Sequence, residues 1–159
     1  MGGMEQRRKI LVHGFAMLTF AFALGLVAGP LGQQHHPHAR LWLGAHITGI
    51  LAGILLIGVG LARPYLQLGA RAGRAFYWSA VGGNWIGMLV LGVFNASIGG
   101  GTAIVTPELA APAGWQGAVI VAALAIVTIT TFLFCGLGLY GLRASAHALN
   151  PAADPGRPS

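Results

Sequence analysis

Charged residues are scarce in this chain of 159 residues, because lysine, arginine, aspartate and glutamate together make up 8% of it. Soluble proteins carry roughly a quarter of such residues, so the composition excludes an ordinary soluble domain. Cysteine occurs once, at Cys135, which excludes an internal disulfide, a Cys-x-x-Cys-His haem attachment and a cysteine-rich zinc site. We interpret Cys135 as part of ordinary helix packing. The hydrophobic content of 55% and the 26 glycines, which let membrane helices approach closely, then predict a membrane protein.

The sequence also lacks the residues of several chemistries. No Ser-His-Asp arrangement is apparent and no carboxylate lies inside a long apolar run, so hydrolysis and proton-coupled transport lack their usual residues. The glycine run at 99–101 lacks the Gly-Lys-Ser/Thr ending of a phosphate-binding loop, and we interpret it as a flexible loop. The loop histidines His35, His36 and His38 match none of the spaced metal-binding motifs.

Four long apolar runs predict four membrane-spanning helices. They cover residues 10–31, 41–62, 75–98 and 117–142. Each run is about long enough to cross the roughly 30 Å hydrocarbon core of a bilayer. The first run is longer than the hydrophobic part of a typical signal peptide, so we interpret it as a retained helix. We therefore expect an all-α membrane protein, a four-helix bundle forming one domain over residues 1–143, followed by a disordered tail, 144–159.

The basic residues indicate how these helices are oriented. With four spans, eight of the nine lysines and arginines fall at one end of the helices and Arg40 alone falls at the other. Basic residues accumulate on the cytoplasmic side of membrane proteins, which predicts cytoplasmic termini. Because the positive charges are spread over helix ends, we expect no nucleic-acid partner despite the net charge of +6. We expect a multi-pass protein of the bacterial inner membrane.

His46 is the one ionisable residue of the run 41–62. An ionisable side chain inside a membrane helix is costly and is by default a candidate functional residue. Gly49 and Gly53 follow it at intervals that place all three within roughly 60° on one helix face. Two interpretations stay open. The glycines form a small-residue helix contact with His46 hydrogen-bonded to a neighbour, or a flat cofactor lies against them with His46 as a metal ligand.

A second line of polar residues is predicted on the run 75–98. At 100° per residue, Met88, Leu91 and Asn95 each fall within roughly 40° of Asn84. Asn84 lies near the middle of its span, where an amide without a partner is expensive, so it meets another helix or a ligand. Asn95 lies near the outer end, where interfacial water is within reach.

Two histidines lie inside the predicted spans, and their depths differ. His13 lies near the cytoplasmic end of the first helix and His46 near the outer end of the second, which separates them by roughly 20 Å along the bundle. The two imidazoles of one chain therefore do not bind the same iron. If a haem is present, we expect one protein ligand and an open sixth position.

Several short motifs together resemble a known family. They are His13-Gly14 in the first run, Ala45-His46 with Gly49 and Gly53 in the second, Arg63-Pro64-Tyr65-Leu66-Gln67-Leu68 after it, Asn84-Trp85 in the third and Gly141-Leu142-Arg143 in the fourth. In this order the chain resembles, from about residue 13 to 143, the small four-helix membrane isomerases typified by hydroxylaminobenzene mutase and styrene oxide isomerase. The mutases look closer, through Pro64-x-Leu66-x-Leu68 and Asn84-Trp85.

The resemblance implies a cofactor and an assembly. It places a haem b between the subunits of a homotrimer, with His46 as the iron ligand and Asn84 lining the pocket. The chain departs from the family pattern at four positions. They are Thr48 for a glutamate of the mutases, Ala52 for an asparagine, and Ala80 and Met88 for an aspartate and a tyrosine of styrene oxide isomerase.

The resemblance also implies a redox-neutral activity. Ferric iron is the Lewis acid for rearranging a small apolar aromatic substrate, either an arylhydroxylamine to an aminophenol or an aryl epoxide to an aldehyde. Asn84 orients the reacting oxygen by a hydrogen bond. The alternative is a non-catalytic membrane protein that binds haem or a small apolar ligand. A third reading is a structural four-helix bundle without a cofactor.

Overall fold

The computed structural model describes residues 3–33, 38–99 and 114–149 and contains no strand among them. Its long helices are α1 (Gly3–Gln33), α2 (Ala39–Ala62), α3 (Ala70–Ile86) and α5 (Trp115–Leu149). A short 3-10 turn, η1 (Arg63–Tyr65), follows α2. A π-helical segment, η2 (Gly87–Phe94), and the short helix α4 (Asn95–Ile98) continue α3 without a break. Four helices are thus long and apolar enough to cross a membrane, which confirms the predicted fold class.

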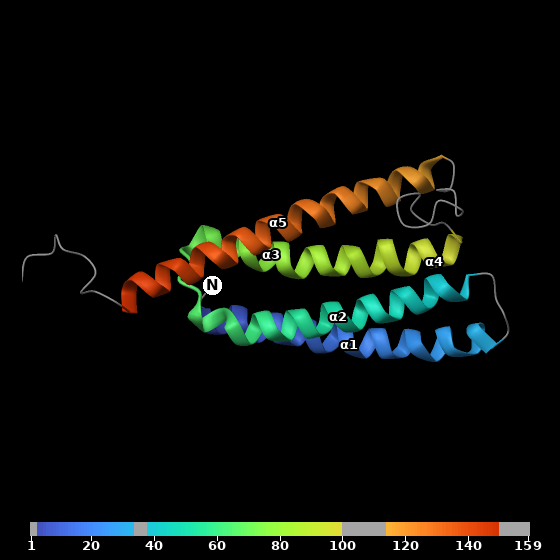
Figure 1. Ribbon diagram of the computed structural model, residues 1–159, viewed down its shortest axis with the longest axis horizontal. Helices are drawn as coiled ribbons and strands as arrows, with labels where there is room; N and C mark the ends of the chain where they lie inside the picture. The colour runs from blue at the N-terminus through green and yellow to red at the C-terminus, as the bar shows by residue number, and fades with distance from the viewer. Residues whose placement is uncertain (1–2, 34–37, 100–113, 150–159) are drawn as a thin grey trace, which may run out of the picture.

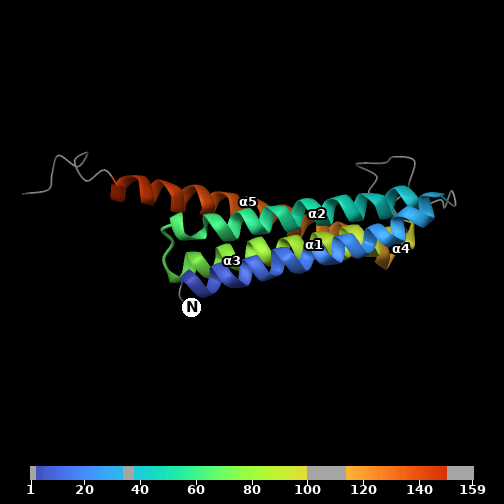
Figure 2. The ribbon, with the colours of Figure 1, turned by 90° about the horizontal axis from the view of Figure 1, so that it is seen from below.

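The four membrane helices pack in two pairs (Figure 1). The most extensive helix contact joins α1 to α2, and the next joins α3 to α5. The views in Figures 1 and 2 both show α1 beside α2 along most of its length, with the N-terminus and the end of α5 at the same end of the bundle. An even number of spans requires that arrangement. Which side of the membrane this end faces stays a prediction.

Two helices are longer than predicted. α1 begins at Gly3 because residues 4–9 favour a helix and Lys9 Nζ lies 2.7 Å from Glu5 Oε1, an i,i+4 ion pair. α1 also continues past Pro30 to Gln33, although proline lacks the N–H that would donate to the carbonyl four residues earlier. α5 reaches Leu149 through an alanine-rich stretch of high helix propensity, so residues 144–149 are not a disordered tail. Residues 150–159 lie outside the described residues.

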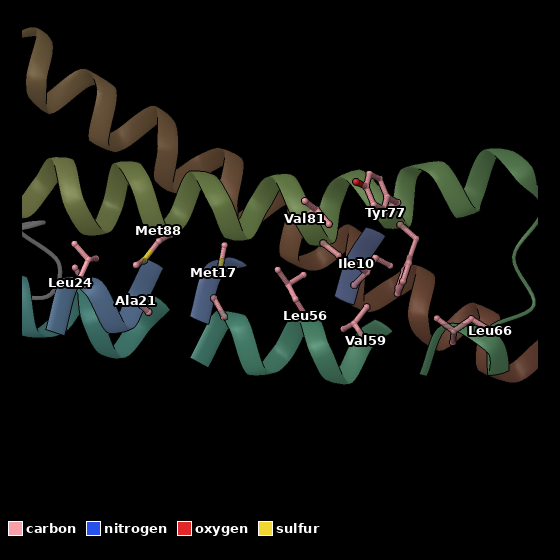
Figure 3. Close-up of a cluster of buried hydrophobic side chains, with 14 residues drawn as sticks. Ile10, Met17, Ala21, Leu24, Leu56, Val59, Leu66, Tyr77, Val81 and Met88 are labelled. Atoms are coloured by element: carbon pink, nitrogen blue, oxygen red, sulfur yellow. The ribbon is translucent and has the colours of Figure 1, made fainter. Parts of the chain in front are cut away.

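The apolar core lies between α1, α2 and the continuous segment of α3 and η2 (Figure 3). Its largest fully buried side chains are Phe76, Ile10, Met17, Leu56, Met88 and Ile120. α1 and α2 approach closely at Gly14, where an added Cβ would lie 2.8 Å from Ile57 Cγ1 and 3.1 Å from the carbonyl oxygen of Gly53. Cys135 is exposed on α5, so it does not take part in the helix packing that we predicted.

Candidate functional site

His46 lies in the contact between α2 and α1. Its Nδ1 is 2.8 Å from the carbonyl oxygen of Ala21, and because a carbonyl only accepts hydrogen bonds, Nδ1 carries the proton. In the neutral imidazole the lone pair is then on Nε2, which has no hydrogen-bond partner among the residues that the structure describes. Histidines that bind metals typically donate their other ring N–H to a backbone carbonyl in this way. The hydrogen bond of His46 has this geometry, and its role as a metal ligand stays a prediction.

The position of the His46 ring depends on a glycine of α1. A Cβ added at Gly25 would lie 2.7 Å from His46 Cε1 and 2.9 Å from Nδ1, closer than real Cβ atoms come. The ring of Phe22, which is 59% exposed, lies edge-on to the imidazole at 6.4 Å between centroids. Gly25 thus leaves room for the ring, and Ala21 sets its orientation. Neither α1 residue was among the predicted site residues, because the contact joins positions 25 residues apart in the sequence.

Gly49 and Gly53 lie in helix contacts and do not form an open face. A Cβ at Gly53 would lie 2.7 Å from Leu18 Cγ, and one at Gly49 would lie 2.8 Å from both Ala21 Cβ and Met88 Sδ. Both glycines are buried. Of the two interpretations, the structure favours the small-residue helix contact for these glycines. The prediction that a flat cofactor lies against them is not supported, because side chains of α1 and η2 fill that space.

The predicted polar line of Asn84, Met88, Leu91 and Asn95 is wrong. It assumed 100° per residue, whereas residues 87–94 form the π-helix η2, in which each turn holds more residues. Asn84 is half-buried and its Nδ2 donates to the carbonyl oxygen of Ala80, 2.7 Å away on its own helix. Asn95 is 9% exposed, and its Oδ1 is buried without a hydrogen-bond partner in the described part of the chain.

Asn84 and His46 lie at different depths in one chain. Met88, one turn after Asn84, packs against Gly49, which follows His46 by three residues on the antiparallel helix. These offsets add to roughly 10 Å along the bundle axis. The structure therefore places His46 next to Gly49 but does not bring Asn84 beside it within one subunit.

Three of the four departures from the family pattern are buried. Ala52 is 8% exposed, Ala80 1% and Met88 0%, and all belong to the apolar core. Figure 3 shows Met88 reaching from η2 toward α1 and α2. Thr48 lies on the exposed side of α2. At these three positions the chain thus has apolar side chains that pack in the core.

A second polar cluster, which was not predicted, surrounds His13. The indole Nε1 of Trp85 donates to His13 Nδ1 at 3.2 Å, which places the proton of the neutral His13 ring on Nε2. The ring of Tyr77 lies edge-on to His13 at 6.3 Å, and Phe20 packs against Trp85. His13 is eight to twelve residues along α1 from the carbonyl and glycine that hold His46, which is roughly 12–18 Å. The prediction that the two histidines lie at separate depths is therefore consistent with the structure.

The loop histidines contribute no metal site that the structure describes. His38 precedes α2, and its ring lies against Gly99, whereas His35 and His36 fall outside the described residues. Gly99 has a φ of +66° and ends α4 in the left-handed conformation that favours glycine. No group of three or more His, Cys, Asp or Glu side chains in residues 3–33, 38–99 and 114–149 is arranged to hold a metal ion.

These observations define a class of protein: a multi-pass membrane protein with one imidazole of a membrane helix hydrogen-bonded to a backbone carbonyl of the neighbouring helix. A model of the family described as styrene oxide isomerase matches residues 6–143. The chain belongs to the styrene oxide isomerase family.

Named relatives support the same assignment. The chain is 33% identical over 155 residues to the hydroxylaminobenzene mutase HabB of Ectopseudomonas oleovorans, which covers 93% of this chain and 90% of that protein. It is 34% identical over 85 residues to the hydroxylaminobenzene mutase HabA of the same organism, which covers 52% of this chain and 62% of that protein. No solved structure gives a significant match. The family and relatives confirm the predicted resemblance and make this chain a member of an isomerase and mutase family.

Proposed function

We propose that this protein is a haem b-dependent membrane isomerase that rearranges arylhydroxylamines to aminophenols. The observation that carries the proposal is the hydrogen bond from His46 Nδ1 to the carbonyl oxygen of Ala21, at 2.8 Å. It leaves Nε2 as a basic nitrogen on a half-buried ring inside an apolar helix pair. Such a nitrogen suits an iron ligand better than it suits a structural hydrogen bond.

The residues around His46 fit a haem whose iron this imidazole would bind. Gly25 admits the imidazole, Ala21 holds it, and the exposed ring of Phe22 offers an apolar surface beside it. Gly49 and Gly53 take no part, because they are covered. When bound, a ferric haem with an open coordination position supplies a Lewis acid that weakens the N–O bond of the substrate.

The chain's own contribution is to exclude water and to orient the substrate. The site lies in membrane helices, and the cations formed in such rearrangements are trapped by water, so an apolar surrounding protects them. In this proposal Asn84 lines the end of the substrate pocket away from the iron, because it lies roughly 10 Å along the bundle axis from His46 within one chain. Its Nδ2 is engaged by Ala80, so Oδ1 is the group that remains for a substrate.

This arrangement favours an arylhydroxylamine over an aryl epoxide. An arylhydroxylamine has N–H and O–H groups that an amide oxygen accepts, whereas an epoxide has only an acceptor. The 33% identity to a hydroxylaminobenzene mutase over 90% of its length supports the same substrate class.

The proposed assembly is a homotrimer with haem between subunits. The exposed apolar side chains on the outer faces of α1 and α2 near His46 are Phe22, Leu26, Leu43 and Ile47. A neighbouring subunit that covers this face encloses the haem on the side that α1 and α2 of one chain leave open.

Product analysis tests the proposal. Detergent-purified protein, reconstituted with haem, is incubated with phenylhydroxylamine and, separately, with styrene oxide, and the products are separated by chromatography. We expect an aminophenol from the first and little turnover of the second, with the activity lost in His46→Ala. Asn84→Ala should lower the rate about tenfold to a hundredfold, as loss of a positioned hydrogen bond does. Haem binding without turnover of either compound would favour the non-catalytic alternative. The buried apolar side chains of Met88, Ala52 and Ala80 agree with that alternative, because they cannot hydrogen-bond a substrate.

A further inference from the structure

One arginine is buried at the end of the bundle that holds the N-terminus. Arg63 of η1 is 8% exposed, and its Nε and Nη2 both donate to Gln6 Oε1, at 3.1 and 2.9 Å. Its Nη1 donates to the carbonyl oxygen of Leu66 at 3.0 Å. Gln6 is itself 3% exposed. The edge of the guanidinium that usually binds a carboxylate is here hydrogen-bonded to the neutral amide oxygen of Gln6.

The positive charge of this guanidinium has no anionic partner in the described chain. A guanidinium stays protonated at all relevant pH values, and a buried charge without a counter-charge is costly. Glu5 is the one acidic side chain in the described residues, and it pairs with Lys9. Arg7 follows Gln6, and its Nε is buried without a hydrogen-bond partner. This end of the bundle, which holds Arg7 and Arg63, therefore has a surplus of positive charge among the described residues.

Donors remain at this site for an anion. A guanidinium carries five N–H groups, and the three hydrogen bonds of Arg63 leave one on Nη1 and one on Nη2. Gly73 of α3 packs directly against this guanidinium, because a Cβ there would lie 3.1 Å from Arg63 Nη2. Arg71 and Arg74, on either side of Gly73, are exposed and add positive charge.

We propose that Arg63 and Arg7 bind the phosphate of an anionic phospholipid headgroup. Gln6, Arg63 and Gly73 all lie within a turn of the ends of candidate membrane spans, which is the level of lipid headgroups. Tyr65, 71% exposed, lies two residues from Arg63, and tyrosine is enriched at that level of the membrane. This lipid site is distinct from the His46 site and does not depend on the proposed function.

Lipid-dependent thermal stability of the full-length protein in detergent tests this site. We expect phosphatidylglycerol to raise the unfolding midpoint of the wild type by several degrees, and phosphatidylcholine of equal chain length or inorganic phosphate to have little effect. Arg7→Gln should weaken the apparent affinity for phosphatidylglycerol about fivefold, the factor for one basic side chain near an anionic surface. Arg143→Gln removes an exposed arginine of α5 at the same end of the bundle as Arg63 and is the matched control. It should change the apparent affinity for phosphatidylglycerol less than twofold.

A near-isosteric variant separates lipid binding from a purely structural role. Gln6→Glu places a carboxylate on Arg63, so the protein should unfold at a higher temperature in phosphatidylcholine and lose most of its response to phosphatidylglycerol. An undiminished response in Gln6→Glu, equal losses in Arg7→Gln and Arg143→Gln, or equal stabilisation by inorganic phosphate would each overturn the proposal.

Discussion

The two histidines inside the membrane helices use the same nitrogen in opposite ways. His46 donates from Nδ1 to the carbonyl oxygen of Ala21, whereas His13 accepts at Nδ1 from the indole of Trp85. The neutral His46 ring therefore has its lone pair on Nε2, and the neutral His13 ring has a proton there. The neighbour of each ring, and not its depth in the membrane, therefore decides which nitrogen of the neutral imidazole carries the proton.

The two sites also differ in what surrounds them. His13 lies among aromatic rings contributed by α3, with Tyr77 and Trp85 on it at about 6 Å between centroids. His46 lies over a glycine of α1 next to the exposed ring of Phe22. Both rings are half-buried, but His13 is in contact with aromatic rings of α3, whereas His46 adjoins the exposed ring of Phe22 on α1.

The largest expected effect comes from removing the space under His46. Gly25→Ala places a Cβ 2.7 Å from the imidazole, so the ring loses its bond to Ala21 and its orientation. We expect haem affinity to fall about tenfold to a hundredfold, as for loss of a partner that orients a metal ligand. Haem titration followed by absorbance measures it. Gly44→Ala, where an added Cβ meets nothing within 4 Å, is the matched control. An equal loss of haem affinity in Gly44→Ala would show that the loss does not come from the contact between Gly25 and His46.

A smaller effect is expected at Gly14, next to His13, where α1 packs closely against α2. Gly14→Ala places a Cβ 2.8 Å from Ile57 and close to the backbone of α2. The free energy of unfolding should fall by about 1–3 kcal/mol, as for overpacking. Chemical denaturation in detergent measures this difference. Gly29→Ala, on the same helix with open space around it, should cause no such loss, and equal stability of the two variants would contradict the packing described for Gly14.

The smallest effect is expected at His13. Trp85→Phe keeps an aromatic ring but removes the N–H that His13 accepts. The free energy of unfolding should fall by about 1 kcal/mol, the usual net value of one hydrogen bond. Haem binding should be unchanged, and titration of the same preparation checks it. A large loss of haem in Trp85→Phe would mean that His13 takes part in the cofactor site.

The number and type of helices could be predicted from the sequence because apolar runs of 22 or more residues are rare outside membranes. His46 could also be selected from the sequence as a candidate site residue, because it is the one ionisable residue of its span. The boundaries were less accurate, since residues 5–9 are polar and nevertheless helical, and α5 continues seven residues past its predicted end. Hydropathy marks the apolar part of a helix and misses polar turns that extend it.

The details of the site depend on contacts between distant residues and were not predictable from one helix at a time. The partner of His46 is 25 residues earlier in the chain, and the donor to His13 is 72 residues later. The rotation of residues 87–94 departs from an ideal helix, so a helical wheel misplaced Asn95. A small-residue helix contact was one of two interpretations of Gly49 and Gly53, and the expectation of a cofactor there is not supported because side chains of α1 and Met88 occupy that face.

The absorption spectrum of the haem-reconstituted protein in detergent tests the central claim most directly. We predict a Soret band from bound haem in the wild type and in His13→Ala, and its loss in His46→Ala, with all three proteins of equal helical content by circular dichroism. A colourless wild type, or a band that persists in His46→Ala and disappears in His13→Ala, would contradict the assignment of His46 as the iron ligand.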